Sequence, residues 1–210
     1  MSSHQGKIDI LIGTQLLFRE LNYQHVGLVG LILVDHLLNI PDYKSAELSF
    51  QFIYQLALNF AERKEPKKLI IQTYQFEHHG LQAIEKLNYN LFYQQETMIR
   101  GELDYPPFTK IIKLDFVGKK GENVKKSAID FIDYIQNSDL VSIYELDFQL
   151  KKDNIIVVRE KDKNRSSCML KINTQKQDID YFKKSLFQYI SKYQSRHVKL
   201  LIDIDPMKMY

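Results

Sequence analysis

Apolar residues along the chain form short continuous runs that alternate with longer stretches of helical periodicity. The runs "IDILIG" and "VGLVGLILV" are typical of strands buried on both faces of a parallel sheet. In the longer stretches the apolar side chains recur every three to four residues, which predicts helices. The elements expected in this part of the chain are strands at 8–13, 26–34 and 67–74 and helices at 43–63 and 78–103. Such alternation predicts β-α-β crossovers and a parallel sheet.

The segment "DYPPF" (104–108) interrupts this pattern, because two prolines cannot lie inside a helix and each extends the residue before it. We therefore expect two domains, 1–104 and 105–210. The elements predicted for the second domain are strands at 109–117, 141–149, 154–159, 165–172 and 197–204, helices at 121–137 and 176–194, and a turn at 151–154. That order indicates a small α+β domain of the split β-α-β kind. The expected fold class is α/β, a partial parallel sheet followed by an α+β domain.

Composition places the chain among globular proteins. Hydrophobic residues make up 44% and charged residues 26% of its 210 residues. No apolar run approaches the roughly 18 residues of a membrane span, and the first residues lack the pattern of a secretory signal. We expect a cytoplasmic protein without membrane partners. Its single cysteine, Cys168, excludes an internal disulfide and a multi-cysteine zinc site, and we expect it to pack within a strand.

The net charge of +3 is distributed unevenly along the chain. Residues 1–104 contain 9 Lys and Arg against 12 Asp and Glu, a net charge of −3. Residues 105–210 contain 20 Lys and Arg against 14 Asp and Glu, a net charge of +6. A basic half of this kind fits contact with a polyanion. A well-solvated charged surface explains the same composition equally well.

The stretch "ILIGTQLLFRELNYQHVGLVGLILVDHLLNIPDYKSAE" resembles motif V and the following segment of the primosomal protein N′ (PriA) family of replication-restart helicases. "IIQTYQFEHHGLQAI", "YPPF" and "VKLLIDIDPMKM" resemble later segments of that family in the same order. The resemblance runs from Ile8 to Met209 and implies the last part of the family's length. It implies that 1–104 is part of the second lobe of a superfamily 2 helicase and that 105–210 is a C-terminal domain that binds DNA or partner proteins.

Within motif V the resemblance implies DNA contacts by four residues, Gly13, Thr14, Gln15 and Arg19. We expect Gly13-Thr14-Gln15 at the carboxyl end of a parallel strand, where a glycine lets the backbone approach a phosphate and polar side chains donate hydrogen bonds. Without the resemblance, these residues predict an ordinary strand-to-helix turn with an N-cap. The sequence departs from the family at Arg19-Glu20, where Lys-Gly is usual.

Motif VI of the family, Gln-x-x-Gly-Arg-x-Gly-Arg, is degenerate in "QLALNFAER" (55–63). The family's arginines reach the γ-phosphate of the nucleotide. Gln55 remains in register, Asn59 and Glu62 replace the arginines, and Arg63 stands one residue late. We expect only Gln55 and Arg63 as remnants of nucleotide binding. The chain also lacks a phosphate-binding loop and the family's zinc-binding cysteines, so ATP and Mg²⁺ are expected only if another polypeptide supplies the first lobe.

A run of basic residues in "KKDN…VVREKDKNRSSCMLK" predicts contacts with DNA phosphates, without sequence specificity and weakened by salt. The residues expected to make these contacts are Lys151, Arg159, Arg165 and Lys171. Arg165 is in register with a basic residue of the family's final hairpin, and we expect it to point to the opposite face of its strand from Lys171. The alternative is a solvated hairpin, because acidic residues dilute the patch.

Other polar pairs are expected to have ordinary structural roles. His78-His79 predicts a helix entry rather than a metal site, since adjacent histidines do not converge on one ion. Asp203 and Asp205 are expected to form a solvent-facing stripe on the last strand rather than an acidic metal pair. No serine, cysteine or histidine constellation indicates a nucleophile, so we expect no catalytic residues.

Three hypotheses follow from these patterns. The first is a module of a replication-restart helicase that binds branched or forked DNA, or other primosome proteins, and is not catalytic alone. The second is a subunit of a split ATP-dependent 3′-5′ DNA helicase whose first lobe is encoded separately. The third is a remnant without activity, in keeping with the degenerate motif VI.

Overall fold

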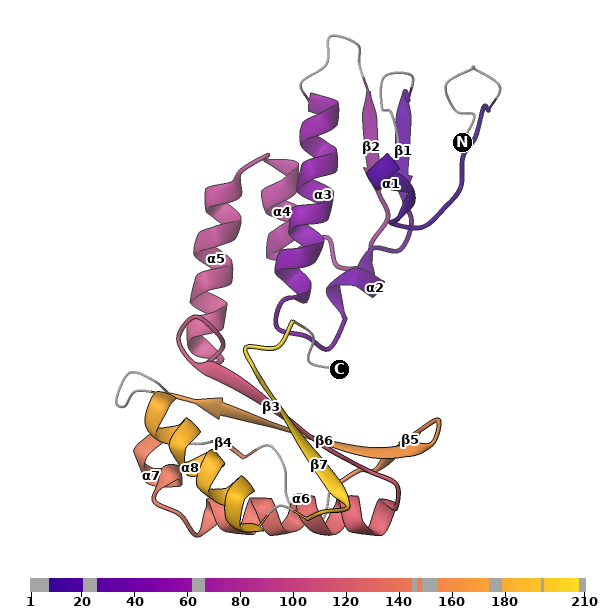
Figure 1. Ribbon diagram of the computed structural model, residues 1–210. Coiled ribbons are helices and arrows are strands. Elements are labelled where there is room, and N and C mark those ends of the chain that lie inside the picture. The colour runs from indigo at the N-terminus through magenta and orange to yellow at the C-terminus, as the bar shows by residue number, and fades with distance from the viewer. Residues whose placement is uncertain are drawn as a thin grey trace. The chain divides into compact units, whose positions relative to one another are not determined.

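The computed structural model describes residues 8–20, 26–61, 67–144, 147–148, 155–173, 179–193 and 195–207. The chain divides into two compact units, Met1–Gln95 (unit 1) and Glu96–Tyr210 (unit 2). Each has its own hydrophobic core, and together they give a mixed α/β protein with a small parallel sheet and an antiparallel one (Figure 1). None of the helices in the described ranges is long and apolar enough to cross a membrane.

Unit 1 contains a two-stranded parallel sheet, as the alternating pattern predicted. Strand β1 (Leu28–Leu31) pairs with β2 (Lys68–Ile71) in a register that places Leu28 beside Lys68. The helices of this unit are α1 (Leu17–Glu20), α2 (Asp35–Leu38), α3 (Ser45–Ala61), α4 (His79–Glu85) and the start of α5 (Tyr89–Glu102). The long helix predicted at 78–103 is therefore two helices.

The core of unit 1 lies on one face of this sheet. Val29 and Leu31 are buried there with Phe50 of α3, whose ring stacks on Phe92 with centroids 3.9 Å apart. On the other face, Leu28 and Ile70 are each more than half exposed, and Ile32, just after β1, is 82% exposed. Among the described residues of unit 1, the core and its helices lie on one face of the sheet, and the apolar side chains of the other face are exposed.

A buried carboxylate joins the loops that follow the two strands. Asp35, 8% exposed at the start of α2, accepts hydrogen bonds from Thr73 Oγ1 at 3.2 Å and from the Tyr74 amide at 3.1 Å. Because both loops leave the carboxyl ends of parallel strands, this carboxylate fixes their spacing. It also receives the partners that a buried charge requires.

The strand predicted at 8–13 was wrong, since residues 8–14 form neither helix nor strand. Ile10 is 80% and Ile12 is 91% exposed, so these apolar residues are not buried in a core of unit 1. An apolar run supplies strand propensity, but a strand also needs a neighbour to pair with and a surface to cover its face. Within the described residues this segment has neither.

Unit 2 is built on an antiparallel sheet. Its elements after α5 are β3 (Lys110–Gly118), α6 (Gly121–Gln136), α7 (Leu140–Tyr144), β4 (Asp147–Phe148), β5 (Val158–Glu160), β6 (Lys163–Ile172), α8 (Ile179–Tyr193) and β7 (Val198–Ile204). The strand order is β4-β6-β3-β7, and the short β5 forms a hairpin with β6. The strands that α6 and α7 connect, β3 and β4, therefore lie on either side of β6.

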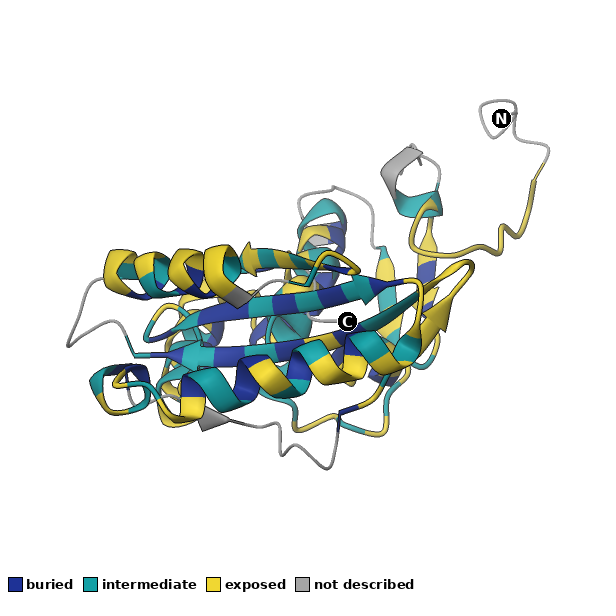
Figure 2. Cartoon of the chain, turned by 60° about the horizontal axis from the view of Figure 1, so that its bottom comes forward, coloured by how far each residue is buried: buried dark blue, intermediate teal, exposed yellow. Residues whose placement is uncertain are grey.

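Alternation along β3 separates the core of unit 2 from an outer face. Ile112, Leu114 and Phe116 are at most 2% exposed and face the helices, whereas Lys113, Asp115 and Val117 belong to the outer face. The buried residues of α6, from Val124 to Ile135, recur at helical spacing and pack in the same core. Figure 2 shows this division, with dark strands and helices that are yellow on their outer sides.

The strand predicted near 141–149 was largely wrong, because residues 140–144 form α7 and, of the described residues in this stretch, 147–148 form a strand. Leu140 and Tyr144 stand four residues apart and are both fully buried, which is the spacing of a helix face. The Tyr144 hydroxyl accepts a hydrogen bond from the Phe182 amide at 3.0 Å, so the helix presents its polar group to the start of α8. The turn expected at 151–154 lies outside the described residues.

Cys168 lies in β6 and is 4% exposed, which confirms that it packs within a strand. Burial raises the pKa of its thiol from 9.0 to about 12. We expect the native chain at pH 8 to react with a disulfide reagent at least ~100-fold more slowly than the same chain unfolded in urea, because the thiolate is the nucleophile. Absorbance at 412 nm with Ellman's reagent measures both rates, and equal rates would contradict a buried thiol.

Candidate nucleic-acid interface

The outer face of the unit 2 sheet gathers basic side chains where β3 ends. Val117 of β3 lies between Arg165 of β6 and Lys199 of β7 in the strand register. Lys163 stands two residues before Arg165, so it belongs to the same face. Strands β6 and β7, which are distant in sequence, therefore place cations on both sides of one apolar residue of β3.

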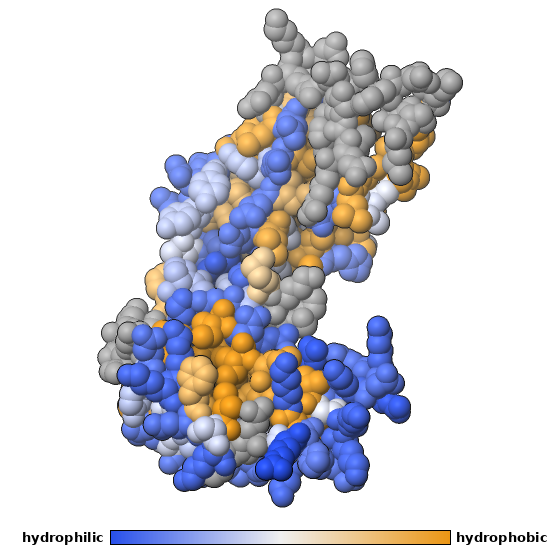
Figure 3. Space-filling view, in the orientation of Figure 1, coloured by the Kyte–Doolittle hydropathy of each residue, from blue (hydrophilic) through white to orange (hydrophobic). Residues whose placement is uncertain are grey.

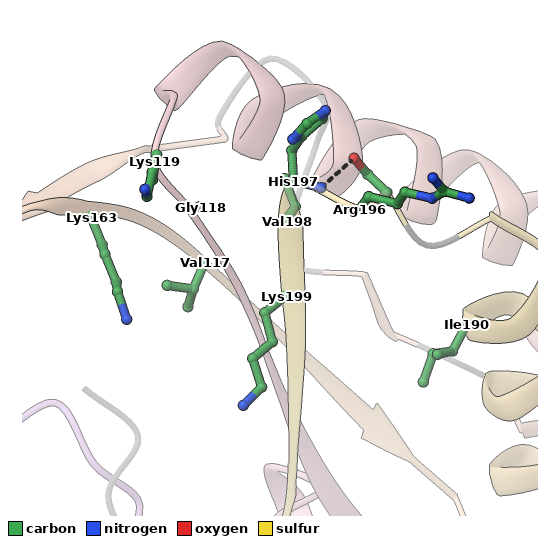
Figure 4. Close-up of a pocket in the computed structure, with 10 residues that line it drawn as sticks. Val117, Gly118, Lys119, Lys163, Ile190, Arg196, His197, Val198 and Lys199 are labelled. Carbon is green, nitrogen blue, oxygen red and sulfur yellow. Dashed lines mark hydrogen bonds between the residues drawn. The ribbon is translucent and has the colours of Figure 1, made fainter.

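These residues border an open pocket of about 520 Å³ at this end of the sheet. We call it the cationic pocket, defined by the four basic residues Lys119, Lys163, Arg196 and Lys199 with Val117 and Val198. In Figure 4 the side chains of Lys163 and Lys199 flank Val117, and Arg196 extends to the other side of β7. The His197 imidazole completes the rim.

The pocket has an uncompensated positive charge. All four basic side chains are exposed, and in the described part of the chain none of them forms an ion pair. Arg165 differs, because its guanidinium is 3.4 Å from Asp115 Oδ2 and 3.3 Å from Glu160 Oε2. The carboxylates of Asp115 and Glu160 therefore pair with Arg165 and not with the basic residues of the pocket.

Gly118 allows the end of β3 to approach the turn that begins β7. A Cβ at this position would lie 2.9 Å from the His197 carbonyl oxygen, which is too short without a shift of the backbone, and in tight contact, 3.1 Å, with Val124 Cγ2. The turn itself is closed by the His197 amide, which donates to Ser195 Oγ at 3.2 Å, and by the Val198 amide, which donates to the Ser195 carbonyl. The backbone thus sets where Arg196 and Lys199 lie relative to β3.

The predicted residues of the basic run do not form one cluster. Arg159 of β5 is exposed and pairs with Asn164, so it belongs to the opposite face of the hairpin from Arg165. Lys171 lies about 20 Å along β6 from Arg165. The expectation that Arg165 and Lys171 face opposite ways was wrong, because their separation of six residues is even and both belong to the outer face. Lys151 lies outside the described residues.

Lys171 has structural partners of its own. Its ammonium donates to the Leu103 carbonyl at 2.9 Å and lies 4.2 Å from the centroid of the Tyr105 ring. A hydrogen bond and a cation–π interaction together hold the segment before β3 against β6. This side chain is engaged within unit 2.

In unit 1, Gly13, Thr14 and Gln15 are exposed and lead into α1. Their expected place at the carboxyl end of a parallel strand was wrong, because 8–13 is not a strand; the Thr14 carbonyl instead accepts from the Leu17 amide at 2.9 Å. These residues therefore enter a short helix. Arg19 lies within α1, and its side chain is outside the described residues.

The remnants expected from motif VI are only partly visible. Gln55 lies in α3 and is exposed. Arg63 lies outside the described residues. The structure therefore places one of the two predicted nucleotide-binding residues on an exposed helix face.

The histidine and aspartate pairs that were not expected to bind a metal have structural contacts or lie exposed. His78 caps α4, its Nδ1 accepting from the Gly80 amide at 3.1 Å, which confirms the helix entry. Asp205 was expected to face solvent but accepts from Lys110 Nζ at 2.6 Å and from the Ile111 amide at 3.2 Å. Asp203 is exposed. Across the described ranges, His, Cys, Asp and Glu form no group of three that could hold a metal ion.

Lys119, Arg196 and Lys199 were missed from the sequence because they belong to two other segments. "GKKG" follows the first strand of unit 2 and "SRHVK" precedes the last, and each is an ordinary basic dipeptide or triplet. Their convergence depends on the register of β6 and β7 against β3. In the sequence, their convergence is indicated only by basic residues next to one end of each of three predicted strands.

Known proteins are similar to the chain over nearly all of it. The replication restart protein PriA of Bacillus subtilis (strain 168) is 32% identical over 207 residues, which cover 98% of this chain and 25% of that protein. PriA of Chlamydia muridarum (strain MoPn / Nigg) is 29% identical over 98% of the chain and 26% of its own length. The chain is homologous to replication restart protein PriA. No protein-family model matches it.

The match to PriA extends over both units, and the sequence identity is higher over a shorter stretch. PriA of Synechocystis sp. (strain ATCC 27184 / PCC 6803 / Kazusa) is 40% identical over 123 residues, 59% of this chain and 15% of that protein. The chain spans about a quarter of the length of the PriA proteins that it matches over most of its own residues. Homology to PriA confirms the resemblance expected from the motifs.

The different surroundings of two lysines on the same face of β6 give a matched test. We expect Lys171→Ala to lower the free energy of unfolding of unit 2 by about 1 kcal/mol, because it removes the cation–π interaction with Tyr105 and the hydrogen bond to Leu103. Lys163→Ala should change it by less than about 0.5 kcal/mol, as for a surface residue without partners among the described residues. Urea unfolding followed by circular dichroism compares the two, and equal effects would contradict a structural role for Lys171.

Proposed function

We propose that the chain is a DNA-contacting module of the PriA type, which acts in replication restart by binding forked or branched DNA and is not catalytic alone. The observation that carries this proposal is the cationic pocket, which is lined by four basic side chains that have no acidic partners among the described residues. Phosphate contacts need only positive charge and donors, and they carry no sequence information. The expected specificity is therefore for DNA structure rather than for sequence.

The distribution of charge on the outer face supports DNA over a smaller anion. The cations of the pocket come from the residue after β3, from the start of β6, from the turn before β7 and from β7 itself. A polymer with a phosphate at each nucleotide can occupy several of these positions at once.

We further propose that the two units correspond to two parts of PriA, a segment of the second helicase lobe and the C-terminal domain. Support comes from the parallel β1–β2 pairing in unit 1 and from the strand order of unit 2. In unit 2, β6 separates β3 from β4, and β3 separates β6 from β7, which is the arrangement of a double split β-α-β unit.

A second candidate function is a subunit of a split helicase, and the open face of the β1–β2 sheet favours it. Parallel sheets are ordinarily covered on both faces, yet Leu28, Ile32 and Ile70 are exposed here. A separately encoded lobe with a phosphate-binding loop would cover this face and bind ATP and Mg²⁺. Copurification of such a chain from the native host would support this function, and a stable protein without any copurifying partner would contradict it.

The DNA proposal is tested by a salt series with fluorescent forked DNA. We expect the logarithm of the association constant to fall linearly with the logarithm of salt concentration. Replacing Lys119 and Lys163 together by Ala should weaken binding and reduce the magnitude of this slope by about two. The slope changes by roughly 0.9 for each phosphate that is no longer neutralised, and the variant lacks two such cations. Fluorescence anisotropy at five or more salt concentrations measures both quantities.

The matched control is Lys125→Ala with Lys184→Ala, which removes the same charge from exposed positions on α6 and α8. This variant should change the slope by less than half as much as the pocket variant. Equal effects of the two variants would show that only net charge matters. A well-folded protein that binds no forked DNA at low salt would overturn the proposal.

A further inference from the structure

Strand β7 (Val198–Ile204) is a long free edge of the unit 2 sheet. In the described part of the chain no strand pairs beyond it, and the opposite edge strand, β4, has only two residues. β7 has no internal proline and keeps an uninterrupted register with β3. Such edges pair with another chain unless bulges, prolines or repelling charges protect them.

The hydrogen bonds at its two ends indicate which residues of β7 offer their backbone to a partner. The Asp205 amide donates to the Ile111 carbonyl at 2.7 Å, whereas the Val198 amide donates back to Ser195 instead of to β3. In an antiparallel ladder, successive residues turn their backbone groups alternately toward and away from one neighbour. Leu200, Ile202 and Ile204 therefore direct their backbone groups to the free edge.

The sequence of β7 is complementary to itself when reversed. On the outer face the strand reads Lys199, Leu201, Asp203. If two copies pair antiparallel about a two-fold axis at Leu201, Lys199 of each lies opposite Asp203 of the other, and the two Leu201 side chains meet. A shift of two residues in either direction places Leu201 opposite a charged residue. Opposite charges across strands stabilise pairing, and like charges destabilise it.

The helix-bearing side of β7 is apolar as well. Leu200, Ile202 and Ile204 are only partly buried against the core, and Ile190 of α8 lies beside the start of the strand. Figure 3 shows apolar side chains gathered on this face of unit 2, surrounded by hydrophilic ones. In the same two-fold register, Leu200 of one copy lies opposite Ile202 of the other. Both faces of the strand thus match in the same register.

We propose that the chain forms a homodimer in which β7 pairs antiparallel with β7 of a second copy, joining two sheets into one. This inference goes beyond DNA binding and needs no nucleic acid. The pairing is isologous, so one surface serves both copies and the assembly closes at two.

Sedimentation velocity of the full chain without DNA, from about 1 to 500 µM, tests the proposal. The wild-type chain should show a concentration-dependent monomer–dimer equilibrium. Lys199→Glu and Asp203→Lys should each weaken it at least ~10-fold, since each places two like-charged pairs across the interface. The double variant reverses both charges and should restore the dimer. Lys125→Glu, on exposed α6, serves as the control and should leave the equilibrium unchanged.

A chain that stays monomeric at 500 µM would overturn the proposal. So would a dimer that both single variants leave intact, which would place the contact elsewhere, for example on the open β1–β2 face. Failure of the double variant to restore a dimer that the single variants weaken would also overturn the charge pairing. Lys199 also borders the cationic pocket, so its replacement can affect DNA binding as well as dimerisation. Sedimentation is therefore measured without DNA, and the monomer–dimer equilibrium that it reports does not depend on whether the chain binds DNA.

Discussion

The pairing of β3 with two strands at once is the constraint on which unit 2 depends. One edge of β3 binds β6 and the other binds β7, in a register that is continuous over most of its length. Alternation along β3 then buries Ile112, Leu114 and Phe116 on one side. The same alternation directs Val117 to the other side, between residues that come from the two neighbouring strands. A single register thus fixes both the core and the cationic pocket.

Unit 1 differs from unit 2 in having a parallel sheet of two strands, which is buried on one side. Its interior is held by α3 and by aromatic stacking, such as that of Phe50 on Phe92. Asp35 holds together the loops at the carboxyl ends of the strands. The other face exposes apolar side chains, among them Leu28 and Ile70.

Most elements were predictable from the sequence, because helical periodicity and apolar runs report burial directly. α6 and β3 are examples, since the apolar residues of each recur without interruption at helix or strand spacing and pack in the core of unit 2. Two of the expected strands were wrong where pattern and context disagree. "IDILIG" has the apolar run of a strand but no described neighbour to pair with. At Leu140 and Tyr144, residues expected in a strand form a helix, because the spacing of their buried side chains is four.

The candidate site was less predictable than the fold. Arg165 and Lys171 are basic in the sequence, but the carboxylates of Asp115 and Glu160 and the ring of Tyr105 engage them. Which cations remain available depends on neighbours across strands, and no local pattern reports these. The pocket residues Arg196 and Lys199 come from a segment more than 70 residues after Lys119. Only the register brings them together.

The ten residues of β6 serve three purposes on two faces, and this limits how the chain can vary in evolution. Cys168 fills the core, Lys163 borders the pocket, and Lys171 anchors the segment before β3. Insertion or deletion of one residue within β6 would exchange inner and outer side chains beyond that point. Length changes are tolerable in the turn at Lys161 and Asp162, which lies outside the strand. Among functional descendants, β6 should therefore change by substitution, while its hairpin turn is free to lengthen.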